Sequence, residues 1–572
     1  MAYHPQGVRF VLTAPETEST EQGFSPWKQM VYASVPARYA PRFLYKKHLN
    51  SESNPDGTAK VMPLGLRIVE DILREHYPPE DVVICHPENL GMFVGPRTRA
   101  VGVAAHNPVG VAFSTGVYSN IFGSTAVPIN AYESTRVYNH AALRRYRPKI
   151  IVGGAGAWQI EKTNSFDRLG IDCTVVGRAE SVILELFQKA DAGEKLPRVM
   201  RAPEPRQDQL RVPARRTTYG VVEMTRGCGR QCAFCSPTLE TRVSLGQDAI
   251  VEAVKANVRE GGRCIFPVSE DIFIYGAPQP FYIPKADALV NFYESVSKVP
   301  GIDYVPLSHA TIAPALVNPH LIKELSGILL NKSILRNPAS THPEKSFISP
   351  LIGIETGSAR LAAQTMSGKA LPFDIRDWQD IVVEGIQILN RNNWFPVCTF
   401  IVGLPGETPD DIKQSLDLLH RLRHNHILYL PSIFTPLEDT RMASGHALQP
   451  RELTQLQWEF ILTAWSQSLK FAVVRRRSNL TWKLGMRAFY YSRGRWLHGP
   501  QFKYPAFRFA GISEKKVSPH LYLKWDQTNG TPDPPPRPPS MIAKHQGATL
   551  DQLNAAQNGG SPALRVLNQP HH

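Results

Sequence analysis

The chain has few cysteines and no long apolar run. Seven cysteines in 572 residues are too sparse, and odd in number, for a framework of disulfides. No stretch approaches the roughly 18–20 apolar residues that a membrane-spanning helix requires. The chain does not open with a basic segment followed by an apolar stretch, as a signal peptide would. From these absences we expect a soluble protein in a reducing, cytoplasmic setting.

Acidic residues are also in deficit. Lys and Arg together number 64 and Asp and Glu 50, which gives a net charge of +14. A basic chain can indicate nucleic-acid binding, but the dense runs here are short and none forms a stripe with interleaved aromatics. They lie at 144–147, 211–216 and 475–477. We therefore expect a solvated basic surface, with RNA binding as the minority alternative.

The length predicts more than one domain. Residues 1–60 are rich in Pro, Ser and Tyr, which predicts an irregular segment. In residues 61–205 a helix at 66–77 and short apolar runs alternate, which predicts a doubly wound parallel sheet of the α/β class with ligands at the carboxyl ends of its strands. Residues 185–216 predict a linker. The strands are expected at 81–85, at 100–105, within 149–157, which ends in a glycine-rich turn, and within 173–180. The loops 106–110, 153–158 and 177–180 lie at the carboxyl ends of three of them.

Strand–helix alternation continues through residues 217–445 and predicts a partial (β/α)6 barrel, whose active site would lie at the carboxyl ends of the strands. Residues 446–526 predict a mainly helical, aromatic-rich region. Residues 527–572 open with a proline-rich run of low hydrophobicity and predict a disordered tail. Barrel strands are expected at 219–224, 263–267, 302–306, 351–354, 397–402 and 427–430, with helices at 247–260, 285–297 and 378–392.

Three cysteines stand close together in the barrel segment. Cys228, Cys232 and Cys235 have the spacing C-x3-C-x2-C, with Phe234 just before the last. Thiolates suit iron–sulfur clusters and zinc. A structural zinc site would need a fourth Cys or His nearby, and none follows before residue 264. Three thiolates leave one iron of a cubic [4Fe–4S] cluster open, which points to chemistry at the cluster.

This spacing resembles the signature of the radical S-adenosylmethionine (SAM) superfamily. The resemblance implies a [4Fe–4S] cluster held by the three cysteines, with SAM at the open iron. Upstream segments resemble the cobalamin-binding domain of the cobalamin-dependent members of that superfamily. These segments are 63–70, 101–110, 153–159 and 177–180. The resemblance covers roughly residues 60–445 and implies three cofactors, namely the cluster, cobalamin and SAM.

Loops at the strand ends carry the residues that the resemblance assigns to cobalamin. Glycines there would let backbones approach closely around a wide, flat ligand. No Asp stands two residues before His106, as it does in cobalt-ligating histidine motifs, so His106 is not expected to bind cobalt. Arg67 could lie near the corrin or be an ordinary helix-start cation. The assigned residues are Arg67, His106, Asn107, Gly110, Gly153, Gly154, Gly156, Trp158, Gly177 and Glu180.

Two barrel segments resemble the SAM-binding motifs of the family. The run 267–270 ends in Glu270, where most members have Gly-Gly-Glu. Glu270 would bind the amino group of SAM or would ligate the open iron itself. The second option would favour polar methyl transfer over radical cleavage. Glu355 and Ser358, within 353–358, resemble the motif near the SAM ribose and carboxylate.

The implied cofactors specify a methyltransferase. SAM would methylate cobalamin, and methylcobalamin would pass the methyl group to an unactivated carbon, while the protein supplies placement and electrostatics. The chain most resembles the tryptophan 2-C-methyltransferases of thiopeptide biosynthesis, which implies tryptophan as substrate and an external electron donor for cobalamin. By that resemblance Arg67 and Glu270 are catalytic, and Tyr304 would take the indole proton if its pKa were lowered from about 10. His309 is the rival base.

Other functions stay open. Radical methylation of an sp3 carbon or a phosphinate would require SAM at the open iron. A tRNA-modifying radical SAM enzyme would suit the basic charge. A methylthiotransferase of that kind would need three more N-terminal cysteines, and residues 1–200 contain only Cys85 and Cys173. A non-catalytic cobalamin sensor would not need the cysteine triad. The sequence indicates no oligomeric state.

Overall fold

The computed structural model describes residues 4–21, 32–49, 51–112, 115, 127–206, 209–238, 240–277, 282–336, 345–437, 440–468 and 480–512. Two compact units divide the chain. Unit 1 contains Met1–Glu223, Leu245–Pro267 and Val299–Tyr304, and unit 2 contains Met224–Ser244, Val268–Lys298 and Val305–His572. The five segments expected from the sequence stay a prediction, and the tail at 527–572 lies outside the described residues.

Unit 1 is built on a six-stranded parallel sheet of order β2-β1-β3-β4-β5-β6. Most strand residues are apolar and buried, as in a sheet covered on both faces. The order places a topological switch point between β1 and β3, where doubly wound sheets bind ligands. This arrangement confirms the α/β class. The strands are β1 (Phe10–Thr13), β2 (Val82–Ile84), β3 (Ala100–Ala104), β4 (Lys149–Gly153), β5 (Cys173–Val176) and β6 (Val199–Arg201).

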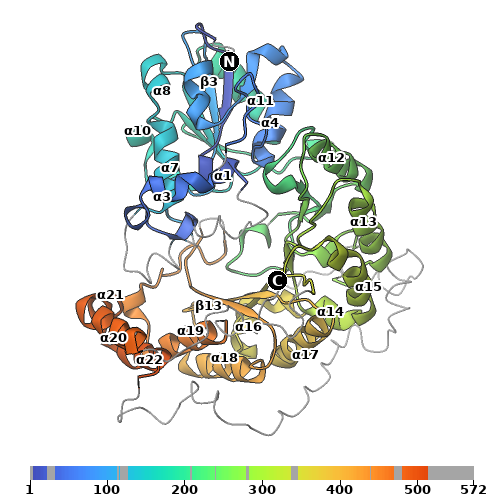
Figure 1. The fold of residues 1–572 in the computed structure, drawn as a ribbon, viewed down its shortest axis with the longest axis vertical. Helices are drawn as coiled ribbons and strands as arrows, with labels where there is room; N and C mark the ends of the chain where they lie inside the picture. The colour runs from blue at the N-terminus through green and yellow to red at the C-terminus, as the bar shows by residue number, and fades with distance from the viewer. Residues whose placement is uncertain are drawn as a thin grey trace, which may run out of the picture. The chain divides into compact units, whose positions relative to one another are not determined.

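Helices cover both faces of the unit 1 sheet, and Figure 1 shows the two groups on either side of β3. One face packs against α4 (Leu64–Arg74) and α11 (Ile183–Asp191). The other face carries α5 (Leu90–Phe93), α7 (Ile129–Tyr138), α8 (Ala141–Tyr146), α9 (Trp158–Lys162) and α10 (Phe166–Leu169). The short helices α1 (Glu16–Ser19) and α3 (Arg42–Tyr45) precede them in the chain.

Two strands of unit 1 correct the sequence predictions. β1 lies within residues 1–60, which we expected to be irregular, yet its four residues are fully buried and it pairs with β2 on one side and β3 on the other. β6 and most of α11 lie within 185–216, which we expected to be a linker. Strands of three or four residues carry too short an apolar pattern to stand out between prolines and charged residues.

Strand–helix alternation continues beyond residue 220, as the sequence predicts. β7 (Val221–Glu223) pairs with β10 (Phe266–Val268). A second, parallel sheet has the order β11-β12-β13-β14. Its strands are β11 (His309–Ala310), β12 (Leu351–Glu355), β13 (Val397–Val402) and β14 (Leu428–Ile433). The strand expected at 302–306 is reduced to a single bridge between Tyr304 and Cys264.

Helices separate these strands in the chain. The segments between β7 and β11 contain α12 (Gln247–Arg259) and α13 (Ala286–Lys298), and α14 (Ala313–Val317) and α15 (Pro319–Leu329) follow β11. After β12 come α16 (Ala359–Met366) and α17 (Trp378–Arg391), and α18 (Pro409–Arg421) follows β13. This order is the one expected of a partial (β/α)6 barrel.

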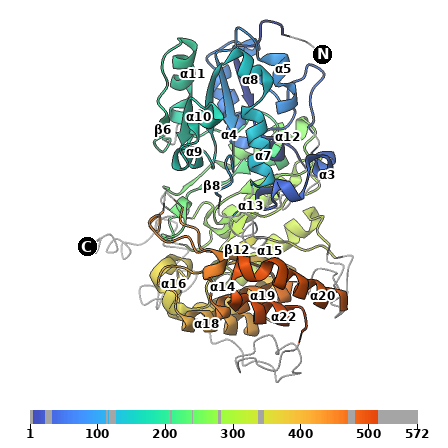
Figure 2. The ribbon, with the colours of Figure 1, turned by 90° about the vertical axis from the view of Figure 1, so that its left-hand side faces the viewer.

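The C-terminal part of unit 2 is helical, as predicted. It contains α19 (Gln455–Ser468), α20 (Leu480–Phe489), a π-helical turn (Tyr490–Gly494), α21 (Arg495–His498) and α22 (Lys503–Phe509). α19 packs against both β14 and α22, and Figure 2 shows α19, α20 and α22 together. Within the described ranges no helix is both long and apolar enough to cross a membrane.

Candidate functional site

The three predicted metal-binding cysteines lie in one loop of unit 2, after β8 (Thr225–Arg226). We call residues 227–238 the triad loop. Backbone hydrogen bonds hold its shape: the Cys228 N–H donates to Pro237 O at 3.1 Å and the Ala233 N–H donates to Thr365 O at 2.8 Å. Tight turns in this loop require left-handed backbone angles. These are found at Gly227, Gly229 and Gln231.

The three thiols influence one another electrostatically. Burial raises the pKa of all three, that of Cys228 to about 11. The Cys232 thiol adds to the rise in the pKa of Cys228, and Cys232 and Cys228 both add to the rise in the pKa of Cys235. Metal binding releases such protons and stabilises the thiolates. Among the described residues, no three His, Cys, Asp or Glu side chains are placed to hold a single metal ion. A cubic cluster spreads its ligands over separate irons, an arrangement that three thiols in one loop can serve.

A buried ion pair ties the triad loop to the rest of unit 2. Arg230 and Asp271 have side chains 1% and 0% exposed. The Arg230 Nε and Nη2 donate to Asp271 Oδ2 at 3.1 and 2.8 Å, and Nη1 donates to Gly368 O at 2.8 Å. Thr311 Oγ1 also donates to Asp271 Oδ2, at 2.6 Å. Sequence reasoning missed Arg230, because an arginine between two cysteines does not reveal its partner.

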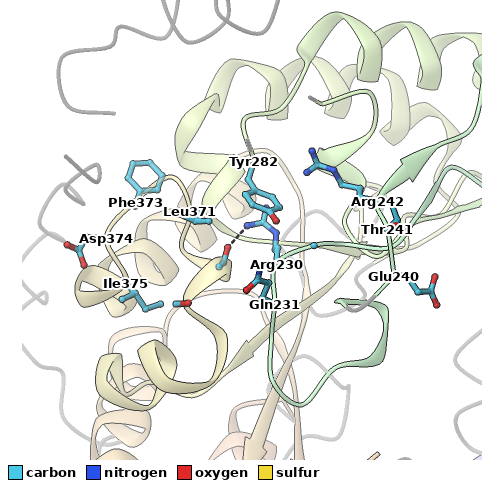
Figure 3. Close-up of a pocket in the computed structure, with 13 residues that line it drawn as sticks. Arg230, Gln231, Glu240, Thr241, Arg242, Tyr282, Leu371, Phe373, Asp374 and Ile375 are labelled. Atoms are coloured by element: carbon cyan, nitrogen blue, oxygen red, sulfur yellow. Dashed lines mark hydrogen bonds between the residues drawn. The ribbon is translucent and has the colours of Figure 1, made fainter. Parts of the chain in front are cut away.

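A cavity of about 740 Å³ adjoins the triad loop. Figure 3 shows Arg230 and Tyr282 between a polar side that includes Arg242 and an apolar side that includes Phe373. The guanidinium of Arg230 lies 4.3 Å from the centre of the Tyr282 ring, and that of Arg242 lies 5.3 Å from it. The volume is ordinary for a small-molecule pocket. None of the residues that we predicted from the sequence lines this cavity.

Glu270 lies within electrostatic reach of the triad. It is half-buried and directly precedes Asp271. After burial and the Cys232 and Lys369 charges, the Glu270 carboxylate is among the causes that set the raised pKa of Cys235. This placement is compatible with either predicted role, as a ligand of the open iron or as a partner for the SAM amino group. Both roles stay predictions.

Glu355 belongs to a polar network beside the triad. It ends β12 at a bulge and has a φ of 63°. Lys369 Nζ donates to Glu355 Oε1 at 2.7 Å and to Gly353 O at 3.0 Å, and Thr399 Oγ1 donates to the same carboxylate at 3.1 Å. Burial alone would lower the pKa of Lys369. The negative charges of Glu355 and Cys232 raise this pKa by more than burial lowers it, so the net shift is upward. The segment 369–373 resembles a family motif in sequence, but sequence reasoning assigned no role to Lys369, which these contacts make a functional candidate.

Ser358 has a structural task. Its hydroxyl accepts the Leu361 N–H at 3.2 Å as the N-cap of α16 and donates to Asp411 Oδ1 at 2.5 Å. The side chain is completely buried. These contacts explain a serine at this position without a ligand, and the predicted contact with SAM stays a prediction.

The pKa values of the two candidate bases, Tyr304 and His309, shift in opposite directions. Tyr304 is buried in unit 1, and burial raises the pKa of its phenol, which opposes action as a base. The His309 side chain in unit 2 is solvent-accessible although protein surrounds it densely. Burial first, and then the Lys369 charge, lower the pKa of His309. The imidazole is therefore neutral near neutral pH and able to accept a proton, so we prefer His309 to Tyr304.

Comparison with known families agrees with this geometry. Residues 222–419 match the family model described as Radical SAM superfamily. Residues 222–419 are a radical SAM domain. The matched range contains the triad, Glu270, Glu355 and Lys369. The match confirms the superfamily that the cysteine spacing resembles.

Curated relatives of the radical SAM domain are distant. The ribosomal protein uS12 methylthiotransferase RimO of Phocaeicola vulgatus is 21% identical over 214 residues, covering 36% of this chain and 43% of the relative. The tRNA-2-methylthio-N(6)-dimethylallyladenosine synthase of Desulfosudis oleivorans is 24% identical over 329 residues, covering 53% and 61%. The chain thus spans roughly half the length of the curated relatives that it matches.

Two solved structures are similar to this chain at low sequence identity. One is the radical S-adenosylmethionine methyltransferase TsrM from Kitasatospora setae with tryptophan and a SAM analogue, with a TM-score of 0.49, 13% identity, and coverage of 76% of this chain and 75% of that one. The other is the cobalamin-dependent SAM radical enzyme OxsB with aqua-cobalamin, with a TM-score of 0.44, 13% identity, and coverage of 76% and 55%.

Outside the radical SAM domain, the switch point of unit 1 holds Glu18 and His106. Glu18 lies in α1, which follows β1, and His106 follows β3. The His106 N–H donates to the Glu18 carboxylate at 2.9 Å. The His106 ring is solvent-accessible and, among the described residues, has no hydrogen-bond partner, while the surrounding protein lowers its pKa. The ring therefore faces open space where a doubly wound sheet binds its ligand.

The glycines after β4 serve two purposes. A Cβ on Gly156 would lie 2.2 Å from His106 O, and one on Gly154 would lie 2.9 Å from Ala105 O, so these two glycines let the loops after β3 and β4 pack together. A Cβ on Gly153 would meet nothing within 4 Å. Gly153 and the exposed His106 thus leave open space at this edge, with which the predicted corrinoid is compatible.

Arg67 is held by structural contacts. Its buried guanidinium donates to Glu70 Oε2 at 2.7 Å, to Lys60 O at 2.8 Å, and to Ala59 O and Arg216 O at 3.0 Å. These bonds join α4 to two neighbouring segments of unit 1. They favour a structural role, and the predicted catalytic role stays a prediction.

The other predicted cobalamin residues are placed around the same edge or support it. Asn107 is buried, and its side chain donates to Thr115 Oγ1 at 2.8 Å, which holds its own loop. Gly110 and Gly177 adopt positive φ values of 82° and 98°. Trp158 begins α9, and Glu180 lies half-buried in a 3-10 turn. No ligand contact is assigned to these residues beyond the prediction.

Replacing Glu18 with glutamine is expected to stabilise the protein as the pH rises. Burial raises the pKa of Glu18 to about 7 from an ordinary 4.5. A carboxyl whose pKa is raised in the folded state contributes stability that is complete below the unfolded pKa and is lost as the pH rises through 7. Glutamine has no such titration. The melting temperature of Glu18→Gln, relative to wild type, should therefore increase between about pH 5 and pH 8.

Scanning calorimetry across this pH range measures the effect. Glu185→Gln, at an exposed position of α11, is the matched control and should give a difference that does not vary with pH. A flat difference for Glu18→Gln as well would contradict the raised pKa of the Glu18 carboxyl at the switch point.

Proposed function

We propose that this chain is a cobalamin-dependent radical SAM methyltransferase. It would pass a methyl group from SAM, by way of cobalamin, to an unactivated carbon, with C2 of the tryptophan indole as the preferred acceptor and an external electron donor to reduce cobalamin. The observation that carries the proposal is the gathering of the triad, Glu270, Glu355 and Lys369 within one radical SAM domain. The open switch point of unit 1 supports the second cofactor.

The side chains of the radical SAM domain would divide the binding work. The three thiols would hold the cluster, and Arg230 fixes the loop that carries them. The ammonium of Lys369 and the carboxylate of Glu355 lie where they could orient the charged carboxylate and amino groups of SAM. When bound, cobalamin supplies a metal that can carry a methyl group between donor and acceptor.

The proposed base is His309. Methylation at C2 of indole requires removal of a proton, and a neutral imidazole can take it. His309→Gln should reduce turnover by roughly 10²–10³-fold while substrate binding changes little. Because the pKa of His309 is lowered by burial, wild-type turnover should fall only on the acid side of the ordinary histidine range. The glutamine variant should lose that acid limb.

Two comparisons make the His309 test specific. His320→Gln, at an exposed position of α15, should leave the pH profile unchanged. Tyr304→Phe tests the base preferred on sequence grounds. If Tyr304→Phe removes turnover and His309→Gln does not, His309 is not the base.

Reconstitution tests the function as a whole. The purified chain is loaded anaerobically with iron, sulfide and cobalamin and is then incubated with SAM, a low-potential reductant and tryptophan. We expect methyltryptophan by mass spectrometry. Deoxyadenosine without methyltryptophan would favour radical methylation of an sp3 carbon or a phosphinate. Failure to bind cobalamin would refute the proposal.

The curated relatives favour a second candidate, a methylthiotransferase acting on tRNA or on a ribosomal protein. Such an enzyme would need a second cluster upstream. The available thiols, Cys85 and Cys173, are buried in separate apolar clusters on opposite faces of the unit 1 sheet, so they cannot share a metal. Nucleoside mass spectrometry of tRNA incubated with the reconstituted protein and SAM would reveal methylthio groups if this candidate were correct.

A further inference from the structure

A long C-terminal stretch of the chain has no acidic residue. Between Glu459 and Glu514 there is no Asp or Glu. Glu459 itself is buried and accepts a hydrogen bond from Arg508 Nη1 at 2.9 Å. The stretch is therefore strongly basic in sequence. Its basic residues within the described ranges are Lys483, Arg487, Arg493, Arg495, Lys503 and Arg508.

Large apolar side chains are exposed among these cations. Leu484, Tyr491 and Trp496 are 54%, 65% and 82% exposed. They lie on the continuous helical segment formed by α20, the π-helical turn and α21, together with exposed arginines. Short π-helical insertions occur frequently at functional sites. We call Leu484, Arg487, Tyr491, Arg493, Arg495 and Trp496 the basic aromatic face.

The basic aromatic face rests on a packed support. On the inner side of the same segment, the buried His498 ring lies 5.1 Å from Trp458 and 4.5 Å from Phe502, measured between ring centroids. Tyr490 is also buried, whereas its neighbour Tyr491 points outward. The exposed aromatic side chains therefore take no part in the buried packing on the inner side of the segment. Contact with a partner would remove their apolar surface from water.

From these features we propose that the basic aromatic face docks a small acidic electron-transfer protein. Trp, Tyr and Arg are the residue types that dominate binding energy in protein–protein interfaces, and arginine binds carboxylates in bidentate geometry. The three arginines of the face, with no carboxylate among its six residues, favour an acidic partner over a basic one. The aliphatic Leu484 would add nothing to base stacking, which favours a protein over RNA.

The proposed function supplies the kind of acidic partner, and this step rests on it. Cobalamin chemistry of the proposed type requires reducing equivalents from outside the chain. Unit 2 links the basic aromatic face to the triad loop: the Met442 N–H donates to Ala233 O at 3.1 Å, and α21 packs on the turn Pro450–Glu452 that follows in the chain. A donor on this face would dock on the unit that carries the cluster ligands.

Binding to an oxidised acidic flavodoxin tests the docking without any turnover. Isothermal titration of the full chain should show binding that weakens as salt is raised. Arg493→Glu combined with Arg495→Glu should lower the affinity at least about tenfold, and Trp496→Ala should lower it several-fold. The matched control is Arg144→Glu with Arg145→Glu, an exposed pair on α8 of unit 1, which should bind like wild type.

Three results would overturn the proposal. They are no binding of flavodoxin by wild type, an equal loss of affinity in the control pair, and an unchanged affinity in both variants of the face. Poly(U) and phosphatidylglycerol vesicles are measured in parallel. If either binds through the same arginines while flavodoxin does not, the face serves RNA or lipid. Because neither SAM nor tryptophan is present, failure of tryptophan methylation would leave this measurement unaffected.

Discussion

Replacing Cys232 with alanine is expected to remove the cluster and all turnover. Cys232 is the most buried thiol of the triad and is the central ligand of the loop. With only two thiols left, a cubic cluster would lose one of its three protein anchors. Iron and sulfide content after anaerobic reconstitution should fall to near zero, and product formation should drop by at least about 10³-fold. Iron analysis, cluster absorbance and product assay measure the effect.

A control variant that removes a buried thiol outside the triad distinguishes loss of the cluster from loss of the folded structure. Cys398 is buried in β13 of the same unit, and Cys398→Ala removes the same atom from the core. That variant should bind iron like wild type, with a modest loss of stability. Full iron content in Cys232→Ala would show that the triad does not hold the cluster, whereas iron loss in both variants would indicate unfolding.

The triad was predictable because its chemistry is local in sequence. Three soft ligands within eight residues identify a metal loop without knowledge of the fold. The apolar runs that became β3, β4 and β13 were predictable for a similar reason, since buried parallel strands carry continuous hydrophobic residues. Arg230 and Lys369 were not predictable in this way, because their partners are not neighbours in the sequence. Arg230 bonds Asp271, and Lys369 bonds the carbonyl of Gly353.

The N-terminal segment shows where pattern reasoning fails. Glu18 lies in a segment that we expected to be irregular, yet it is buried in a short helix at the switch point against the His106 backbone. A carboxylate among Pro, Ser and Thr residues gives no sign of burial, because burial follows from the sheet order. Only after β1 is placed between β2 and β3 does its following helix reach the ligand edge.

Arg230→Met is expected to be the most destabilising single substitution proposed here. The change would leave Asp271, which is completely buried, without its counter-charge. Removing one partner of a buried ion pair costs about 3–5 kcal/mol, because the remaining charge stays desolvated and unpaired. The Gly368 carbonyl would lose a donor as well. The free energy of unfolding of the metal-free chain, measured in urea under reducing conditions, should fall by this amount.

Loosening of the triad loop should follow from the same substitution. Arg230 stands between the first two cysteines, and its bonds to Asp271 and Gly368 hold that loop in place. The reconstituted Arg230→Met protein should therefore release iron to a chelator faster than wild type. The double variant Arg230→Met with Asp271→Asn removes the unpaired charge while keeping an acceptor for Thr311. It should be less destabilised than the two single changes added together, by roughly 0.5–3 kcal/mol.

An exposed ion pair provides the contrast that makes the Arg230 result interpretable. Arg376 bonds Asp374 but is 86% exposed, and solvent screens such pairs so that breaking one costs at most about 1 kcal/mol. Arg376→Met should therefore leave both stability and iron retention near wild type. If Arg230→Met were as harmless as Arg376→Met, the buried pair would not be what holds the triad loop. If it lowered stability without faster iron release, the loop would owe its shape to the backbone bonds of Cys228 and Ala233 instead.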